Sequence, residues 1–302
     1  MSNIQEKNHE TRLAAGILAV SIFLLLFSMS GSFFHGKVTH DYPQGYGASD
    51  AYWTLSDVDW TVRSGLYRVA SPNLIGFVDL PYPTPEPPLI MYFAGGLATM
   101  LSIPHYDAVN LALTLLIISA FIALFCMLHR ITVNAAIPFT PYIAIMQTFP
   151  FLVLYSWGFW RQAFAISLFF IGLFFLTQKR SMTRNITVGI IVGAMVLAYG
   201  AWAAYFIIVI MIFEIIRLTM TRRVHDFISG GIAMAGTAFM ICAAYLPDLA
   251  AGRTEESAFG SGVFKVIAEA YFPTNAGVGW AQIVWPILVT TACIIMILCL
   301  RS

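Results

Sequence analysis

The chain has 302 residues, of which 59% are hydrophobic and only 10% are charged, and its formal net charge is +1. Soluble domains are roughly 45–50% apolar, so this composition predicts an integral membrane protein. It also excludes the strongly basic surface that nucleic-acid recognition requires, and we expect no nucleic-acid partner. The four cysteines lie in apolar runs, without the spacing of a disulfide framework or a zinc site.

The first apolar stretch, residues 13–34, is long enough to cross a bilayer, which takes about 20 residues. Lys7 and Arg12 precede this stretch. A removable signal peptide is the alternative, because Ser28 and Ser30 form a weak small-x-small cleavage pattern. Both interpretations place the following segment outside the cytoplasm.

The segment that follows, residues 35–107, is a predicted outer loop of about 70 residues, whereas connections usually have about 4–6. Loops of this size are normally functional or carry their own secondary structure. Its proline-rich stretch PYPTPEPPL, residues 81–89, predicts a stiff, extended connection. An apolar segment follows at 87–103. If this segment crossed the membrane, the positively charged connections downstream would lie outside the cytoplasm. We therefore expect it to lie on the outer face as a juxtamembrane or re-entrant helix.

A helix is also predicted earlier in this loop, capped by Ser49 or Asp50 and reaching to about residue 64. Asp50 and Asp57 would share one face of this helix, because seven residues make nearly two turns. Asp59 and Arg63 are four residues apart and are expected to pair on another face.

Further apolar stretches cover residues 108–128, 136–157, 162–177, 186–216, 227–246 and 281–300. The stretch 186–216 is too long for one ordinary span. A single helix would put Arg184 and Arg217 on opposite sides of the membrane, whereas two helices turning near Gly200 keep both inside, where cations are preferred. We expect each of these two helices to have roughly 13–16 residues.

These stretches predict an all-α polytopic membrane protein with about eight transmembrane helices. Residues 1–302 are expected to form a single transmembrane module with both termini in the cytoplasm. Its outer loops are residues 35–107, which carry juxtamembrane helices, and residues 247–280. The positive charges favour this orientation, because ten of the sixteen lysines and arginines then lie inside.

Several short motifs follow one another in the loop: Asp50 with Tyr52, then Gly65-Leu66-Tyr67, then Tyr82-Pro83 through Pro87-Pro88-Leu89. Their order, between a first outward span and a surface helix, resembles that of the integral-membrane GT-C glycosyltransferases. Arg161-Gln162, at the entry to a later span, is also similar to the family pattern. The resemblance covers mainly the first 180 residues, and each motif is degenerate by itself.

The resemblance implies transfer of a sugar from a polyprenyl-phosphate-linked donor to a glycan, lipid or protein acceptor on the extracytoplasmic side. An inverting transfer needs a carboxylate as general base and cations for the leaving phosphate. We assign the base to Asp50, with Asp41 as the alternative, and the phosphate to Arg161, Arg68 and Arg253. Acceptor binding or support of the loop is expected from Tyr52, Asp57, Tyr67, Tyr82 and Glu86. No cofactor is predicted, and no divalent cation is indicated.

Simpler interpretations stand beside these assignments. The alternative role of Asp50 is that of a helix cap, and the alternative role of Arg161 is to anchor a span at the interface. His35, His40 and Asp41 form at most a weak metal motif. A transporter or flippase for a lipid-linked or polar substrate, and a noncatalytic membrane subunit, are the alternative functions. The chain ends soon after its eighth predicted span, as expected of either a minimal family member or an N-terminal fragment.

Overall fold

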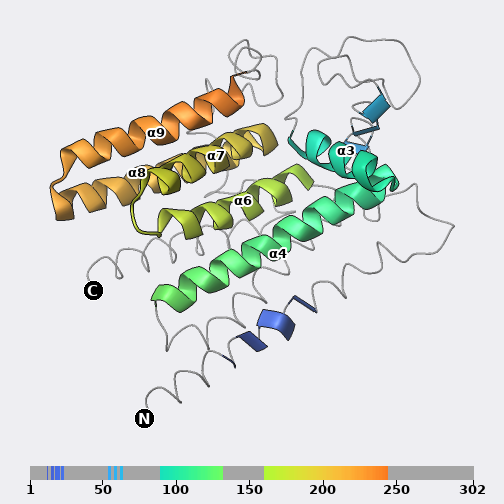
Figure 1. The fold of residues 1–302 in the computed structure, drawn as a ribbon, viewed down its shortest axis with the longest axis horizontal. Helices are drawn as coiled ribbons and strands as arrows, with labels where there is room; N and C mark the ends of the chain where they lie inside the picture. The colour runs from blue at the N-terminus through green and yellow to red at the C-terminus, as the bar shows by residue number, and fades with distance from the viewer. Residues whose placement is uncertain are drawn as a thin grey trace, which may run out of the picture. The chain divides into compact units, whose positions relative to one another are not determined.

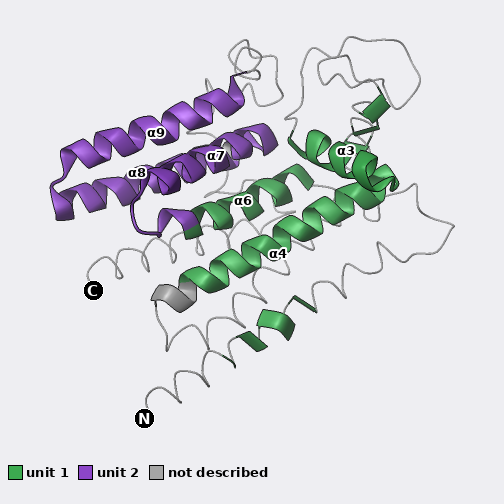
Figure 2. Ribbon diagram, in the orientation of Figure 1, with its two compact units in different colours: residues 1–174 green, residues 175–302 purple. Residues whose placement is uncertain are grey.

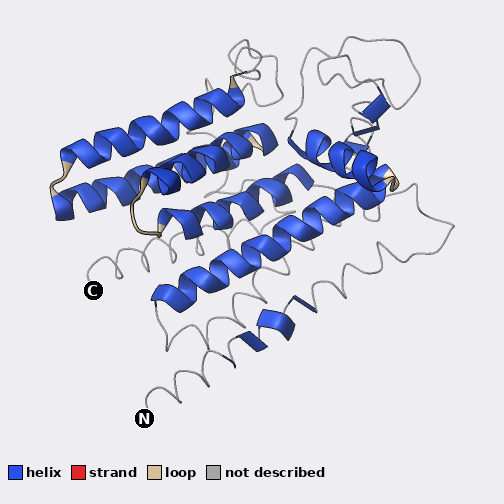
Figure 3. Ribbon diagram, viewed as in Figure 1, coloured by secondary structure: helices blue, strands red, loops and turns tan. Residues whose placement is uncertain are grey.

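The computed structural model describes residues 89–131 and 160–243, together with single helical residues between positions 12 and 23 and between positions 54 and 63. All regular secondary structure in these parts is α-helical (Figure 3), as the sequence predicts. The predicted spans at 136–157 and 281–300, and the second outer loop, lie outside the described residues. The chain divides into two compact units, residues 1–174 and residues 175–302 (Figure 2).

In the first unit, α3 (Leu89–Leu101) is the predicted helix between the outer loop and the next span (Figure 1). It starts directly after Pro88, and its 13 residues extend about 20 Å at 1.5 Å per residue. That length falls short of the hydrocarbon core of about 30 Å, which agrees with the prediction that this segment does not cross the membrane. α3 packs against α4, and its buried residues include Ile90, Ala94 and Ala98.

The next helix, α4 (His105–Ile131), confirms the span predicted at 108–128. The helix begins three residues before the apolar stretch because the turn at Pro104 starts it, with the Ala108 amide donating to the Pro104 carbonyl at 3.0 Å. Asp107 lies in the first turn, where its negative charge interacts favourably with the helix dipole. Most of α6 (Trp160–Leu176) also belongs to this unit and confirms the helix predicted at 162–177.

The second unit contains α7 (Met182–Ala198), α8 (Gly200–Thr221) and α9 (Val224–Cys242). The predicted break in the long apolar stretch is confirmed, because Tyr199 is extended (φ −167°) and separates α7 from α8. The predicted lengths are wrong, since α7 has 17 residues and α8 has 22. Caps rather than hydrophobicity set the outer ends: the Ser181 hydroxyl accepts from the Arg184 amide, and Arg222 ends α8 in a left-handed conformation (φ 54°).

Three described helices are long and apolar enough to cross a membrane: His105–Met127 within α4, Trp202–Thr221 within α8, and Val224–Cys242, which is α9. They support an integral membrane protein. The helices α3, α6 and α7 are apolar but shorter.

Helices α7 and α9 pack closely against each other (Figure 1). They run parallel, since later residues of α7 contact later residues of α9. Gly189 faces Met234, and Gly193 faces Ala238 and Ile241. The two glycines form a G-x-x-x-G spacing, which lets helix backbones approach each other in membranes. This interface was not predicted from the sequence.

We expect Gly189→Ala to destabilise the second unit by about 1–3 kcal/mol, the usual cost of overpacking. A Cβ at this position would lie 2.5 Å from the Met234 carbonyl oxygen, so the α9 backbone would have to move. Thermal unfolding of the purified protein in detergent measures the effect. Gly236→Ala on α9 is the matched control, because a Cβ there has no atom of the described structure within 4 Å. Equal unfolding temperatures for the two variants would contradict the packing argument.

Candidate active site

The described residues of the first outer loop form part of a helix that contacts α3 through Val62. The described residues of this segment are helical, as predicted: Thr54, Leu55, Val58, Asp59, Val62 and Arg63. Thr54 and Val58 are buried, and a Cβ added at Gly95 of α3 would lie 3.2 Å from the Val62 Cγ2. The loop helix is therefore packed against the helical bundle of the first unit.

Asp59 anchors this loop helix at its polar side. Its carboxylate lies 2.8 Å from the Arg63 Nε, which confirms the predicted pair, and 3.0 Å from the His105 Nδ1. His105 is the first residue of α4, so this contact joins the outer loop to the start of a predicted span. His105 was not singled out in the sequence, although it opens a polar His-Tyr-Asp triplet directly before an apolar stretch.

Aromatic contacts bring the start of α6 to the same place. The Trp160 ring is buried, and its centroid lies 6.2 Å from that of Tyr106 in the first turn of α4. One turn further along α6, Phe164 meets Phe93 of α3 edge to face at 5.8 Å. The N-terminal ends of α4 and α6 therefore lie together, as the predicted topology requires of two spans that both enter from outside.

Arg161 is the one predicted site residue within the described part of the chain. It follows Trp160 in the first turn of α6 and is half-buried. It therefore belongs to the end of the first unit where the loop helix, α3 and α4 also meet. We call this end, made of the loop helix and the starts of α4 and α6, the loop-helix end.

Two buried polar residues on α4 continue inward from this end. Asn110 and Thr114 are one turn apart, and both are buried. They were missed in the sequence because each stands alone in an otherwise apolar stretch.

The other predicted site residues lie outside the described residues. They are Asp50 and Asp41 for the base, Arg68 and Arg253 for the phosphate, and Tyr52, Asp57, Tyr67, Tyr82 and Glu86 for acceptor binding or loop support. The assignments of these residues remain predictions. Within the described ranges, no group of three or more His, Cys, Asp and Glu side chains is placed to hold a metal ion.

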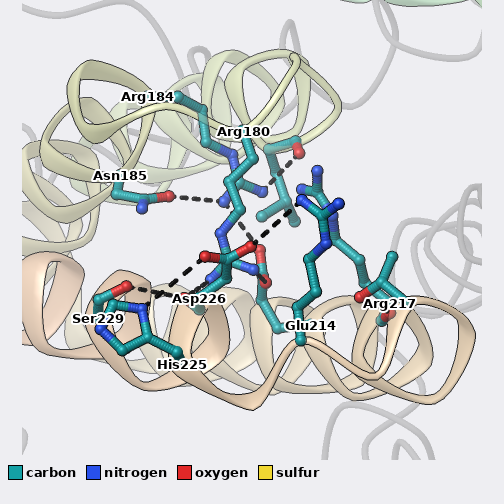
Figure 4. A network of polar contacts seen from close by, with 11 residues as sticks. Arg180, Arg184, Asn185, Glu214, Arg217, His225, Asp226 and Ser229 are labelled. Carbon is teal, nitrogen blue, oxygen red and sulfur yellow. Dashed lines mark hydrogen bonds and ion pairs between the residues drawn. The ribbon is translucent and has the colours of Figure 1, made fainter.

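The second unit contains a separate polar cluster at the ends of its helices (Figure 4). Arg184 of α7 donates to the Glu214 carboxylate of α8 at 2.8 Å, and the two side chains are 2% and 4% exposed. Arg184 also donates to the Leu176 carbonyl at 2.7 Å and to the Asn185 side chain at 2.8 Å. We call this set, with Arg180, the arginine–glutamate cluster.

Arg180 extends the cluster to α9. Its guanidinium lies 3.6 Å from the second oxygen of Glu214 and donates to the Asp226 carbonyl. The contacts confirm that the end of α6, the start of α7, the end of α8 and the start of α9 share one end of the unit, as predicted from their positive charges. Among the described residues, the contacts of the cluster join parts of the second unit to one another. We therefore assign the cluster a structural role, as a clamp between these helices.

No protein-family model and no curated protein matches the sequence. Among solved structures, the archaeal oligosaccharyltransferase AglB from Archaeoglobus fulgidus, in complex with an inhibitory peptide and a dolichol-phosphate, is similar to this chain with a TM-score of 0.53 and 14% sequence identity. The match covers 94% of this chain and 37% of AglB, so the chain spans well under half the length of that protein. AglB is a GT-C enzyme, and at this identity the likeness concerns the fold. The chain therefore has a GT-C-like fold.

Proposed function

We propose that the protein is a GT-C-type glycosyltransferase that moves a sugar from a polyprenyl-phosphate-linked donor to an acceptor on the extracytoplasmic side of the membrane. The observation that carries the proposal is the fold similarity to AglB over 94% of the chain. The AglB structure contains an inhibitory peptide and a dolichol-phosphate, and the second of these is a lipid phosphate of the class that we propose for the donor's carrier. The motifs of the first outer loop agree with this assignment.

In this reaction the acceptor loses a proton, the anomeric carbon forms a bond to the acceptor, and its bond to the phosphate oxygen breaks. The acceptor nucleophile gives its proton to a carboxylate as it attacks the anomeric carbon of the donor sugar. The bond from that carbon to the phosphate oxygen breaks, and the lipid phosphate leaves with an additional negative charge. A carboxylate and a cation on opposite sides of the sugar are therefore the minimal machinery.

We assign the carboxylate to Asp50, and helix geometry supports this choice. A residue four positions before Thr54 lies about 40° from it around a helix axis, at the border of the side that Thr54 and Val58 bury. On a helix that continues to Asp50, as the sequence predicts, Asp59 would lie about 180° from Asp50. Asp59 is already engaged by Arg63 and His105. In this proposal Asp59 anchors the loop helix and Asp50 acts on the acceptor.

Arg161 is the proposed cation, because it lies at the loop-helix end and a guanidinium can bind two phosphate oxygens at once. We expect Arg161→Gln to weaken productive use of the lipid-linked donor by about 10- to 150-fold, from the worth of hydrogen bonds to charged groups. Arg161→Lys should recover part of that loss, because it keeps the charge but not the planar fork. Initial rates at varied donor concentration measure both variants.

The control for Arg161 is Arg130→Gln, which removes an arginine of the same unit near the opposite end of α4 and should leave donor dependence unchanged. A residue that only anchors α6 at the interface would be replaced without a change in donor dependence. Equal kinetics for Arg161→Gln and the wild type would therefore remove Arg161 from the site.

The proposal as a whole is tested with the purified full-length protein in lipid vesicles. A labelled sugar on a polyprenyl-phosphate carrier is supplied together with an extract of extracytoplasmic glycans, lipids and proteins. We expect label to pass from the lipid phase to an acceptor and free polyprenyl phosphate to accumulate. Labelled sugar that crosses the vesicle membrane on its carrier without being transferred would instead indicate a flippase.

A further inference from the structure

The end of the second unit that holds the arginine–glutamate cluster has a large excess of positive charge. Between residues 175 and 243 there are six cationic side chains and two carboxylates. The cations are Lys179, Arg180, Arg184, Arg217, Arg222 and Arg223, and the acids are Glu214 and Asp226. The contacts of Arg180 with Asp226 and of Arg184 with Glu214 bring all of them to the same end.

The internal contacts of the cluster engage Arg180 and Arg184, and the other cations are not part of it. Glu214 is held by Arg184 at 2.8 Å and by Arg180 at 3.6 Å, so its charge is compensated inside the unit. Lys179, Arg217 and Arg222 have no acidic partner among the residues that the structure describes. The surplus therefore belongs to side chains outside the clamp.

Arg223 adds to this surplus. Its guanidinium lies 4.0 Å from the Asp226 carboxylate and is 77% exposed, which is the geometry of a weak surface pair. Lys179 and Arg222 are also exposed. Three cations at this end are thus both accessible and weakly compensated.

The depth of these cations follows from the helices beside them. Arg222 and Arg223 form the whole connection between α8 and α9, and both helices qualify as membrane spans. A two-residue link between consecutive spans has to lie at the depth of the lipid headgroups. Met220 and Val224 flank the link, and both are exposed, as suits residues at the boundary of the acyl chains.

We propose that Lys179, Arg222 and Arg223 form a binding surface for the headgroups of anionic phospholipids. The phosphate of such a lipid lies at the depth of these side chains, and a guanidinium fork matches its oxygens. The surface is expected to prefer an anionic over a zwitterionic headgroup because the zwitterionic one carries its own compensating cation. This proposal does not depend on the proposed glycosyl transfer, since it concerns the other unit and the opposite, cytoplasmic end of the predicted topology.

The test measures lipid binding to the purified full-length protein by native mass spectrometry, with phosphatidylglycerol and phosphatidylcholine titrated separately. The double variant Arg222→Gln/Arg223→Gln should lose affinity for phosphatidylglycerol by about 25-fold, or roughly fivefold for each cation near the surface. Its affinity for phosphatidylcholine should stay the same. The single variant Lys179→Gln should lose about fivefold, and it tests the same surface without altering the α8–α9 link.

The control variant Lys37→Gln/Lys265→Gln removes two charges from the predicted outer loops and should keep full affinity for phosphatidylglycerol. Equal affinity of the wild-type protein for the two lipids would overturn the proposal. So would an equal loss in the control, because net charge rather than this surface would then decide binding. Competition by inorganic phosphate at millimolar concentration would assign the cations to a free anion and contradict a lipid site.

Discussion

Asp50→Asn is expected to reduce sugar transfer by about 10²- to 10⁴-fold, the usual contribution of a general base. The amide is nearly the same size as the carboxylate and still accepts hydrogen bonds, but it cannot take the proton of the acceptor. The donor should still bind, because the phosphate contacts lie elsewhere in the proposed site. Single-turnover transfer from a labelled polyprenyl-phosphate sugar measures the effect, and donor retention on the protein measures binding.

Asp79→Asn is the matched control, since it removes a carboxylate from the same predicted outer loop at a position with no assigned role. It should retain transfer within a few-fold. Full activity of Asp50→Asn would eliminate Asp50 as the base, and loss of transfer in Asp41→Asn instead would give the role to the alternative residue. Transfer retained by both variants would assign the base to another carboxylate, whereas a wild-type protein without any transfer would be better described as a noncatalytic membrane subunit.

Arg184→Met is expected to lower the free energy of unfolding by about 3–5 kcal/mol, which is typical when one partner of a buried ion pair is removed. The variant leaves the Glu214 carboxylate buried without its hydrogen-bond donor at 2.8 Å. It also leaves the Leu176 carbonyl and the Asn185 side chain without the guanidinium that both contact. Denaturant unfolding in mixed micelles, followed by circular dichroism, measures the change.

Two further variants separate a buried pair from a general loss of charge. Arg223→Met removes an exposed arginine from the same end and should cost less than about 1 kcal/mol. The double variant Arg184→Met/Glu214→Leu should recover most of the stability, because neither buried charge then lacks its partner. Similar losses for Arg184→Met and Arg223→Met would show that the cluster is not a clamp.

The distribution of positive charges predicted where the long apolar stretch breaks, but the sequence did not predict where the two helices end. The requirement that Arg184 and Arg217 lie on one side was enough to place a break near Gly200, and the break occurs at Tyr199. The lengths of α7 and α8 were underestimated because Ser181 and Arg222 cap the helices beyond the apolar residues. An apolar stretch indicates which residues lie within the membrane, whereas capping residues determine where the backbone hydrogen bonds of the helix end.

Contacts between distant residues were the part that the sequence could not supply. Asp59 and Arg63 were predicted to pair because helix geometry fixes a spacing of four. The contact of Asp59 with His105 joins residues 46 positions apart, and that of Arg184 with Glu214 joins residues 30 positions apart. The glycine spacing of α7 can be read directly, but nothing in it names α9 as the partner.

The elements around the proposed site were predicted from the sequence more fully than its side-chain contacts, and the site itself remains a prediction. A long outer loop with its own helix, next to the start of a span that carries Arg161, agrees with the way in which the loop helix, α3, α4 and α6 meet. The assignment of Asp50 depends on family resemblance and on helical spacing. It therefore requires the functional test of the Asp50 and Asp41 variants.

Glycosyl transfer from a lipid-linked donor is tested by the side of the membrane on which the sugar donor is consumed. Sealed vesicles of both orientations, containing the full-length protein, are given a labelled polyprenyl-phosphate sugar or a labelled nucleotide sugar on the accessible face. We expect transfer from the lipid-linked donor only in vesicles whose accessible face is extracytoplasmic, and none from the nucleotide sugar. Transfer from the nucleotide sugar at the cytoplasmic face, or no consumption of the lipid-linked donor in either orientation, would contradict this expectation.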